Sequence, residues 1–383
     1  MVITNGLKHC TRLDSRTGRF AARDVRAINH AHVVTREAVA EDATVVFEDG
    51  RVAGLAPRPE RGAGTIDAAG RYVLPGLVDL HSDSMEREYA PRPGADLSVE
   101  LAFLETDRSY ASAGITTAFN AIAFVNSDPR TIERGRRFFG VVQAARAEAL
   151  VHHELHGRFE VAQIDSIDTA ESLIPGGDMR MVSLMNLESH KSFLDERREA
   201  RDQVAPDVGR AWDHFDRFRR SAQEHSVLLA SHDDAEPARL DRLAAAGFSI
   251  FEMPVNVETA RRAKDLGLFC YMGAPNVFRG RSYVGNLSAM HVAELGLLQG
   301  LCSDYYPPSL VQAVFQLARR RTLSLPAAVA LVTSAPALAV GLGERGDLRP
   351  GSLADAIVVG ERLGLPVVTH TIVCGKLVYN AER

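Results

Sequence analysis

A histidine and an aspartate stand two residues apart where an apolar segment ends, in Val78-Asp79-Leu80-His81-Ser82-Asp83. Side chains alternate along a β-strand, so His81 and Asp83 would point to the same side of a strand that ends here. An imidazole nitrogen and a carboxylate oxygen on one side can ligate a divalent metal. A bare His-x-Asp is more often two solvated polar residues, so its interpretation depends on the rest of the chain.

Other imidazoles and carboxylates follow later apolar segments in the same way. They are His156 and Glu160, which share one face with Arg158, then His232 and Asp234 on one face, Glu252, and Asp304. Imidazole and carboxylate ligands suit Zn, Mn, Fe or Ni. Such a metal lowers the pKa of a bound water, and Asp304 could accept the proton and pass it to a leaving group. The pattern therefore favours a hydrolytic metal site over isolated surface polar residues.

The middle of the chain alternates apolar segments with helix-like stretches, which predicts βα units and a parallel sheet. The eight expected strands are 73–83, 114–124, 152–161, 181–186, 227–234, 249–254, 269–276 and 301–307. Helices are expected at 98–113, 131–150, 211–225, 259–265 and 289–299. This alternation fits a (β/α)8 TIM barrel, in which active sites lie at the carboxyl ends of the strands. The polar residues named above stand at those ends.

Short β-type segments occur at both ends of the chain. They are 31–34, 44–47 and 51–55, with the hairpin signal Asp49-Gly50, and then 355–359, 367–373 and 376–379. We therefore expect a small β-sandwich domain formed by 27–78 and 345–383. The barrel would occupy 79–344, and residues 1–26 would be a polar leader.

Length and composition limit the class of protein. A chain of 383 residues exceeds the usual single core of about 250–300 residues, so a large and a small domain are expected. The net charge of −5 gives no basic face for nucleic acid, and no apolar run reaches the ~18 residues of a membrane span. The start lacks the apolar core of a signal peptide, and the four cysteines form no CxxC pair and indicate no disulfide scaffold. We expect a cytoplasmic protein. A homo-oligomer is plausible, although the sequence does not specify one.

The segment Leu74-Pro75-Gly76-Leu77-Val78-Asp79-Leu80-His81, the strand-end His and Glu residues, and the late Ser303-Asp304 resemble the amidohydrolase superfamily over residues 27–380. The resemblance implies a metal-dependent (β/α)8 barrel with a β-sandwich from both termini. It also implies one or two divalent metal ions and a catalytic Asp304. The metal ligands that it implies are His81, Asp83, Glu160, His232 and Asp304, with Glu252 as a sixth.

Longer strings resemble a diphosphatase branch of that superfamily, which is linked to phosphonate metabolism through the carbon–phosphorus lyase pathway. These strings are 90–93, 113–117, 229–235, 272–280, 285–286 and 303–307. This resemblance implies release of diphosphate from a ribosyl phosphonate triphosphate. One departure concerns the segment after the fourth strand, where the branch carries Met-Asp-His-Thr/Ser-Pro-Gly-Gln. This chain reads Met-Asn-Leu-Glu-Ser-His-Lys at 185–191, so the substrate is the least determined part of the resemblance.

A phosphorylated small-molecule substrate with several negative charges needs cations or amide donors around it. Candidate substrate-binding residues are Arg92, Arg158, Lys191, Asn276, Arg279, Arg281 and Asn286. The simpler interpretation of such residues is that they solubilise the surface or form ordinary turns.

Two other functions remain open at this point. The same metal chemistry could open a cyclic amide or lactone or remove the acyl group of an N-acyl sugar, and few cations near the site would favour that reaction. A barrel without catalysis, serving as a scaffold, would show an empty and unresponsive metal site.

Overall fold

The computed structural model describes residues 23–382 except 127–129, 186–207, 281 and 283–285. The strands of the described residues form a nine-stranded and an eight-stranded sheet. The chain divides into two compact units. One contains residues up to 118 together with 144–153 and 303–383, and the other contains 119–143 and 154–302. The expected domain boundaries at 27, 79 and 345 differ from this division and stay a prediction.

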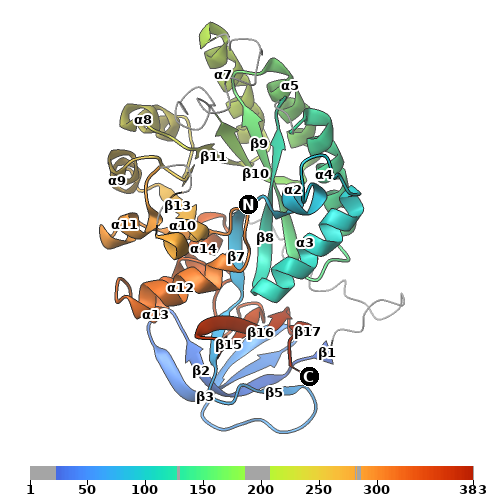
Figure 1. Ribbon diagram of the computed structural model, residues 1–383, viewed down its shortest axis with the longest axis vertical. Coiled ribbons are helices and arrows are strands. Elements are labelled where there is room, and N and C mark those ends of the chain that lie inside the picture. Colours follow the sequence, from blue (N-terminus) through green and yellow to red (C-terminus); the bar gives the residue numbers. More distant parts are fainter. Residues whose placement is uncertain (1–22, 127–129, 186–207, 281, 283–285, 383) are drawn as a thin grey trace. The chain divides into compact units, whose positions relative to one another are not determined.

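The nine-stranded sheet draws its strands from both ends of the chain (Figure 1). Its strands are β1 (Arg23–Asp24), β2 (Ala27–Val34), β3 (Val39–Glu48), β4 (Arg51–Ala56), β5 (Thr65–Asp67), β6 (Tyr72–Pro75), β15 (Ala356–Arg362), β16 (Leu365–Val373) and β17 (Lys376–Asn380). The order is β1-β17-β16-β15-β6-β2-β3-β4, with β5 beside β2. Buried residues such as Ile28, Val45 and Val358 form one core cluster from strands of both ends. The predicted β domain from both termini is confirmed.

Two tight turns in this sheet follow from residue types. Asp49 and Gly50 have φ of 49° and 71° between β3 and β4, as a two-residue hairpin of the primed kind requires. Cys374 and Gly375 repeat the pattern, with φ of 48° and 76° between β16 and β17. Before β2, Arg23 and Asp24 already pair with β17, while residues 1–22 of the expected leader lie outside the described residues.

The eight-stranded sheet is a near-closed barrel with strand order β14-β13-β12-β11-β10-β9-β8-β7. Its strands are β7 (Leu77–Ser82), β8 (Ile115–Phe124), β9 (His152–Glu160), β10 (Met179–Met185), β11 (Leu228–His232), β12 (Ile250–Glu252), β13 (Phe269–Gly273) and β14 (Gly300–Cys302). The pairs from β9 to β14 are parallel. An isolated parallel bridge between Ser82 and Asp304 joins the end of β7 to the residues after β14. The predicted TIM barrel is confirmed.

The expected strand 73–83 is wrong as a single strand, because it divides into β6 and β7 in different sheets. The break falls at Gly76, whose N–H donates to the carbonyl of Asp355 at 2.9 Å. A Cβ at Gly76 would lie 2.3 Å from Oγ1 of Thr116, so a side chain there has no room. Glycine at this position therefore lets the chain pass from one sheet to the other.

Helices follow most barrel strands, and the predicted ones are present with shifted ends. The helices are α2 (Ser84–Tyr89), α3 (Val99–Ala113), α4 (Ile132–Ala145), α5 (Ile164–Leu173), the 3-10 turn η1 (Ile174–Gly176), α7 (Val208–Glu224), α8 (Pro237–Ala245), α9 (Val257–Asp265), α10 (Ala274–Arg279), α11 (Ala289–Glu294), α12 (Ser309–Arg319), α13 (Leu325–Ala330) and α14 (Ser334–Ala339). Ser98 caps α3 by accepting the Leu101 N–H at 3.1 Å, and Gly114 ends it with φ of 84°. Figure 1 shows α8, α9 and α11 on the outer side of β11 and β13.

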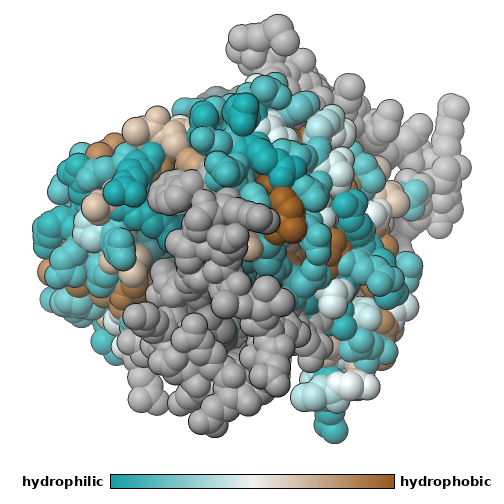
Figure 2. Space-filling view, turned by 90° about the horizontal axis from the view of Figure 1, so that it is seen from above, coloured by the Kyte–Doolittle hydropathy of each residue, from teal (hydrophilic) through white to brown (hydrophobic). Residues whose placement is uncertain are grey.

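Two further observations concern the surface and the cysteines. On the face drawn in Figure 2, the described residues are mostly hydrophilic, and hydrophobic ones form small separate patches. In the described part of the chain, every helix is too short or too polar to span a bilayer.

Cys270 and Cys302 are free and buried, whereas Cys374 is disulfide-bonded, which the cysteine spacing did not indicate.

Candidate metal centre

His81, Asp83 and Asp304 come together at the point where β7 ends and the chain leaves β14. One ligand atom of each lies within 4.8 Å of the others, as a shared metal ion requires. His81 is buried, and its Nε2 is 3.2 Å from Oδ1 of Asp83, whose side chain is 15% exposed. His81, at the end of β7, and Asp83, at the start of α2, thus lie together with Asp304, and their use as metal ligands stays a prediction.

Backbone hydrogen bonds hold these three residues in place. The N–H of Asp304 donates to the carbonyl of His81 at 3.0 Å, and the N–H of Asp83 donates to the carbonyl of Asp304 at 2.7 Å. Asp304 has φ of 57°, a left-handed conformation that costs a non-glycine residue free energy and persists only where neighbours fix it. These hydrogen bonds therefore hold Asp304 in an unfavourable backbone conformation, which fixes the direction of its side chain.

Asp79 lies fully buried just before these ligands on β7. Its Oδ1 accepts the N–H of Ser303 at 2.9 Å and the N–H of His81 at 3.3 Å. Burial raises the pKa of Asp79 to about 6, although a hydrogen bond with the Ser303 side chain and the two backbone hydrogen bonds favour the charged form.

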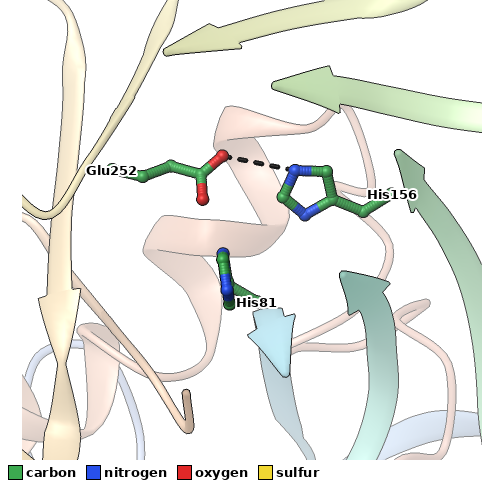
Figure 3. A group of neighbouring side chains, drawn as sticks. All are labelled: His81, His156 and Glu252. Carbon is green, nitrogen blue, oxygen red and sulfur yellow. Dashed lines mark ion pairs between the residues drawn. The ribbon is translucent and has the colours of Figure 1, made fainter. Parts of the chain in front are cut away.

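A second group of possible metal ligands consists of His81, His156 and Glu252, all buried, with ligand atoms within 4.8 Å of one another (Figure 3). Nε2 of His156 and Oε1 of Glu252 form an ion pair of 3.3 Å, and both side chains are fully inaccessible to solvent. The hydroxyl of Ser183 on β10 is hydrogen-bonded to both. Glu252 was expected among the ligands. His156 was placed on the correct strand face but left out of the ligand set, and its alternation with Glu160 was the signal that could have included it.

Glu160 and His232, the remaining expected ligands, do not belong to either group found among the described residues. Glu160 is buried at the end of β9, where its Oε1 accepts the N–H of Ala162 at 3.1 Å. His232 ends β11, and its Nδ1 is 2.5 Å from Oδ2 of Asp233. Both stand at carboxyl ends of barrel strands, so their role as ligands stays a prediction.

Asp234, expected on the same face as His232, instead forms an ion pair with Arg239 at 3.2 Å. Burial is the main cause that raises the pKa of Asp234, and the charge of Arg239 opposes it. Arg239 is a permanent cation, so Asp234 has a charge partner on α8.

The candidate substrate-binding residues lie in different environments. Arg158 is buried on β9, Arg279 is exposed at the end of α10, Asn276 is partly buried in α10, and Arg92 is exposed after α2. Asn286 is partly buried, and Lys191 and Arg281 lie outside the described residues. Their contact with a substrate stays a prediction.

The donors of both groups are imidazole nitrogens and carboxylate oxygens, which suits a borderline divalent ion such as Zn, Mn, Fe or Ni. Neither free cysteine takes part in these groups, although both are buried in the barrel strands. The residues present therefore fit a hydrolytic metal site, and they leave the identity of the ion open.

Known proteins are similar to this chain in sequence or in fold, although no family model matches it. The chain is 29% identical over 377 residues to the alpha-D-ribose 1-methylphosphonate 5-triphosphate diphosphatase of Escherichia coli strain K12, covering 92% of this chain and 100% of the relative. Dihydropyrimidinase from Brevibacillus agri NCHU1002 superposes with a TM-score of 0.66 at 14% identity, covering 93% of this chain and 95% of that one. N-isopropylammelide isopropylaminohydrolase from Burkholderia multivorans ATCC 17616 gives a TM-score of 0.64 at 18% identity, covering 93% and 99%.

These two structures establish the fold, and the relative aligned over its full length adds the sequence kinship. The imidazole and carboxylate groups at the barrel strand ends supply the chemistry. The chain thus has the fold of these two enzymes, is similar in sequence to a named diphosphatase, and brings together imidazoles and carboxylates that could hold a divalent metal ion.

Proposed function

We propose that this chain releases diphosphate from alpha-D-ribose 1-methylphosphonate 5-triphosphate and leaves the 5-phosphate. The observation that carries the proposal is the 29% identity, over the whole length of the relative, to a diphosphatase named for that substrate. The group of His81, Asp83 and Asp304 supports it, since a hydrolase of this kind needs ligands for a divalent ion at its strand ends.

His81, Asp83 and Asp304 would hold one divalent ion, and His156 and Glu252 form with His81 the alternative set of ligands, since a neutral imidazole offers one lone pair to a metal. When bound, such an ion polarises a phosphoryl oxygen and lowers the pKa of a water molecule beside it. The imidazoles and carboxylates would hold the ion, and burial of His81, His156 and Glu252 keeps bulk water away from these side chains.

Asp304 is the residue that we assign to proton transfer. Its carboxylate lies in the same group as His81 and Asp83, and its backbone is fixed by hydrogen bonds on both its N–H and its carbonyl. It accepts the proton of the attacking water and returns it to the leaving diphosphate. A positioned carboxylate base of this kind accelerates a reaction by about 10²–10⁴-fold.

Arginines would neutralise the departing diphosphate, because phosphoryl transfer depends mainly on positioning and electrostatic stabilisation. Arg158 is a buried cation on β9, the strand that carries His156. Arg279 is an exposed cation at the end of the helix that follows β13. We propose that Arg158 binds the inner phosphoryl groups and Arg279 the outer ones.

The test is to incubate the purified protein with the ribosyl phosphonate triphosphate and to follow diphosphate and 5-phosphate by ³¹P NMR. Removal of metal with a chelator should abolish turnover, and adding Zn, Mn, Fe or Ni one at a time should identify the ion that restores it. Turnover of hydantoin, a lactone or an N-acyl sugar without any diphosphate release would contradict the proposal and favour a carbonyl substrate. A protein that takes up no metal would favour a scaffold.

Asp304→Asn tests the mechanism. We expect kcat, measured at saturating metal concentration, to fall by about 10²–10⁴-fold, while thermal stability stays close to that of the wild type. Asp42→Asn is the matched control, since Asp42 is also an aspartate with positive φ (46°) but is exposed in β3 of the β domain. An Asp304→Asn variant with wild-type kcat would remove Asp304 from the mechanism.

A further inference from the structure

We propose that Asp79 is a positioning residue that sets the spacing between the metal ligands His81 and Asp304. Its carboxylate acts as a hydrogen-bond acceptor shared by the two strand ends that carry these ligands. The inference rests on the proposed function for the use of His81 and Asp304 as ligands, and its test reads metal binding without a substrate.

The contacts of Asp79 converge on one oxygen atom. Oδ1 accepts the N–H of His81 at 3.3 Å and the N–H of Ser303 at 2.9 Å, and Ser303 directly precedes Asp304. Asp79 and Ser303 are 224 residues apart in the sequence. A single carboxylate oxygen therefore ties together the backbone at both ligands.

The neighbouring hydrogen bonds show why this tie matters. Beyond Asp79, the two segments are joined by the bond from Asp304 N–H to the His81 carbonyl and the bond from Asp83 N–H to the Asp304 carbonyl. The bridge between Ser82 and Asp304 is isolated and is not part of a regular ladder. Asp79 thus supplies a side-chain acceptor where the seam between β7 and β14 has few ladder bonds among the described residues.

The burial of Asp79 argues against a role in packing alone. The side chain is inaccessible to solvent. Burying a carboxylate costs free energy that burying an apolar side chain of the same size would not. A residue needed only to fill this space would be apolar, so the acceptor oxygen is the feature that a substitution must preserve.

Another interpretation is that the negative charge of Asp79 acts on His81 through space. The two interpretations differ for Asp79→Asn, which keeps an acceptor oxygen of the same shape but removes the charge. They agree for Asp79→Leu, which keeps the volume and removes both the acceptor and the charge.

The experiment measures the affinity of metal-stripped protein for Zn²⁺ alone, and the visible absorption of the Co²⁺-loaded protein. We expect Asp79→Leu to bind Zn²⁺ about 10–100-fold more weakly and to change the Co²⁺ bands, as loss of an orienting partner does at other metal sites. Asp79→Asn should bind within about threefold of the wild type, with Co²⁺ bands in place.

Asp107→Leu is the matched control. Asp107 is a buried aspartate that also accepts two backbone N–H groups, from Leu150 at 2.8 Å and Val151 at 3.2 Å, but it belongs to neither ligand group. Its loss should lower stability and leave the Zn²⁺ affinity of the folded protein unchanged.

Either of two results would overturn the inference: a folded Asp79→Leu variant with wild-type Zn²⁺ affinity and Co²⁺ bands, or an Asp79→Asn variant as weak as the leucine variant. If Asp79→Leu does not fold, Asp79→Asn decides alone, since retained affinity supports the acceptor role and lost affinity refutes it. A wild-type protein that binds Zn²⁺ but releases no diphosphate would contradict the proposed function and leave this inference standing.

Discussion

Arg345–Asp355 in one compact unit and His156–Glu252 in the other are both ion pairs withdrawn from solvent. Nη1 of Arg345 lies 2.6 Å from Oδ2 of Asp355, with side chains 1% and 0% exposed. Nε2 of His156 lies 3.3 Å from Oε1 of Glu252, with both side chains 0% exposed. By distance and burial alone, both would be assigned to stability.

The two pairs differ in the chemistry of the groups that contact the carboxylates of Asp355 and Glu252. Asp355 pairs with a permanent cation, and its other oxygen accepts the N–H of Cys374 at 2.8 Å, in the turn that joins β16 to β17. Glu252 is bonded to an imidazole and to the hydroxyl of Ser183. An imidazole can lose its proton and ligate a metal, which a guanidinium cannot do. Burial alone therefore does not indicate function, and what distinguishes the second pair is that both its members lie with His81 in a group of possible metal ligands.

The largest expected effect is on the stability of the first pair. Arg345→Met should lower the free energy of unfolding by about 3–5 kcal/mol, because it leaves Asp355 as an uncompensated buried charge. Urea denaturation measures this. The double variant Arg345→Met/Asp355→Leu should recover much of the loss, and a single variant as stable as the wild type would contradict a structural role.

A substitution in the second pair, His156–Glu252, should change the affinity for a metal ion more than the stability. Glu252→Gln should weaken metal binding by about 10–100-fold, or roughly 1.4–2.7 kcal/mol, and change the unfolding free energy of metal-free protein by less than about 1 kcal/mol. Competition against a chromogenic chelator measures the affinity. A large stability loss with unchanged affinity would make this pair structural, like Arg345–Asp355.

Ser183→Ala sharpens the comparison inside the second pair. Removal of the hydroxyl that contacts both His156 and Glu252 should cost about 0.5–1.5 kcal/mol of stability in the metal-free protein. In the metal-loaded protein the cost should shrink, because the ion then holds both side chains. Thermal unfolding with and without Zn²⁺ measures the difference, and an equal cost in both states would contradict it.

The smallest effect concerns His370 in β16, a buried imidazole outside both ligand groups. Burial is the main cause that lowers its pKa, with Arg71 adding to the effect and Glu382 opposing it. The unfolded chain then binds the proton first as pH falls below about 6.5, so stability is lost with acidification. In the His370→Phe variant, the free energy of unfolding should fall less steeply as pH decreases through about 6.5. Urea titrations at several pH values measure this, and the same dependence on pH as in the wild type would contradict it.

Sequence patterns predicted the barrel, the β domain and the direction of side chains, because these depend on short-range periodicity. The depth of each side chain in the barrel depends on strand register, which the sequence does not state. His156 pairs in register with Met181 and Glu160 with Met185, so these two residues of one strand face lie at different levels. That difference is why His156, and not Glu160, meets Glu252.

The sequence did not predict the division of the segment 73–83 or the role of Asp79, for a related reason. A side chain at Gly76 would collide with Thr116, and Asp79 accepts the N–H of Ser303, so each feature depends on a residue distant in the sequence. Local patterns cannot contain such information, whereas the alternation of His81 and Asp83 is local and was predicted.

The bridge between Ser82 and Asp304 has a consequence for biosynthesis. Because it joins the first barrel strand to residues that follow the last one, a growing chain cannot assemble the His81, Asp83 and Asp304 group until almost the whole barrel has emerged from the ribosome. Contacts between segments so far apart form slowly. Chains truncated before Asp304 should therefore retain no high-affinity metal site of this kind, and metal uptake would mark the completion of folding.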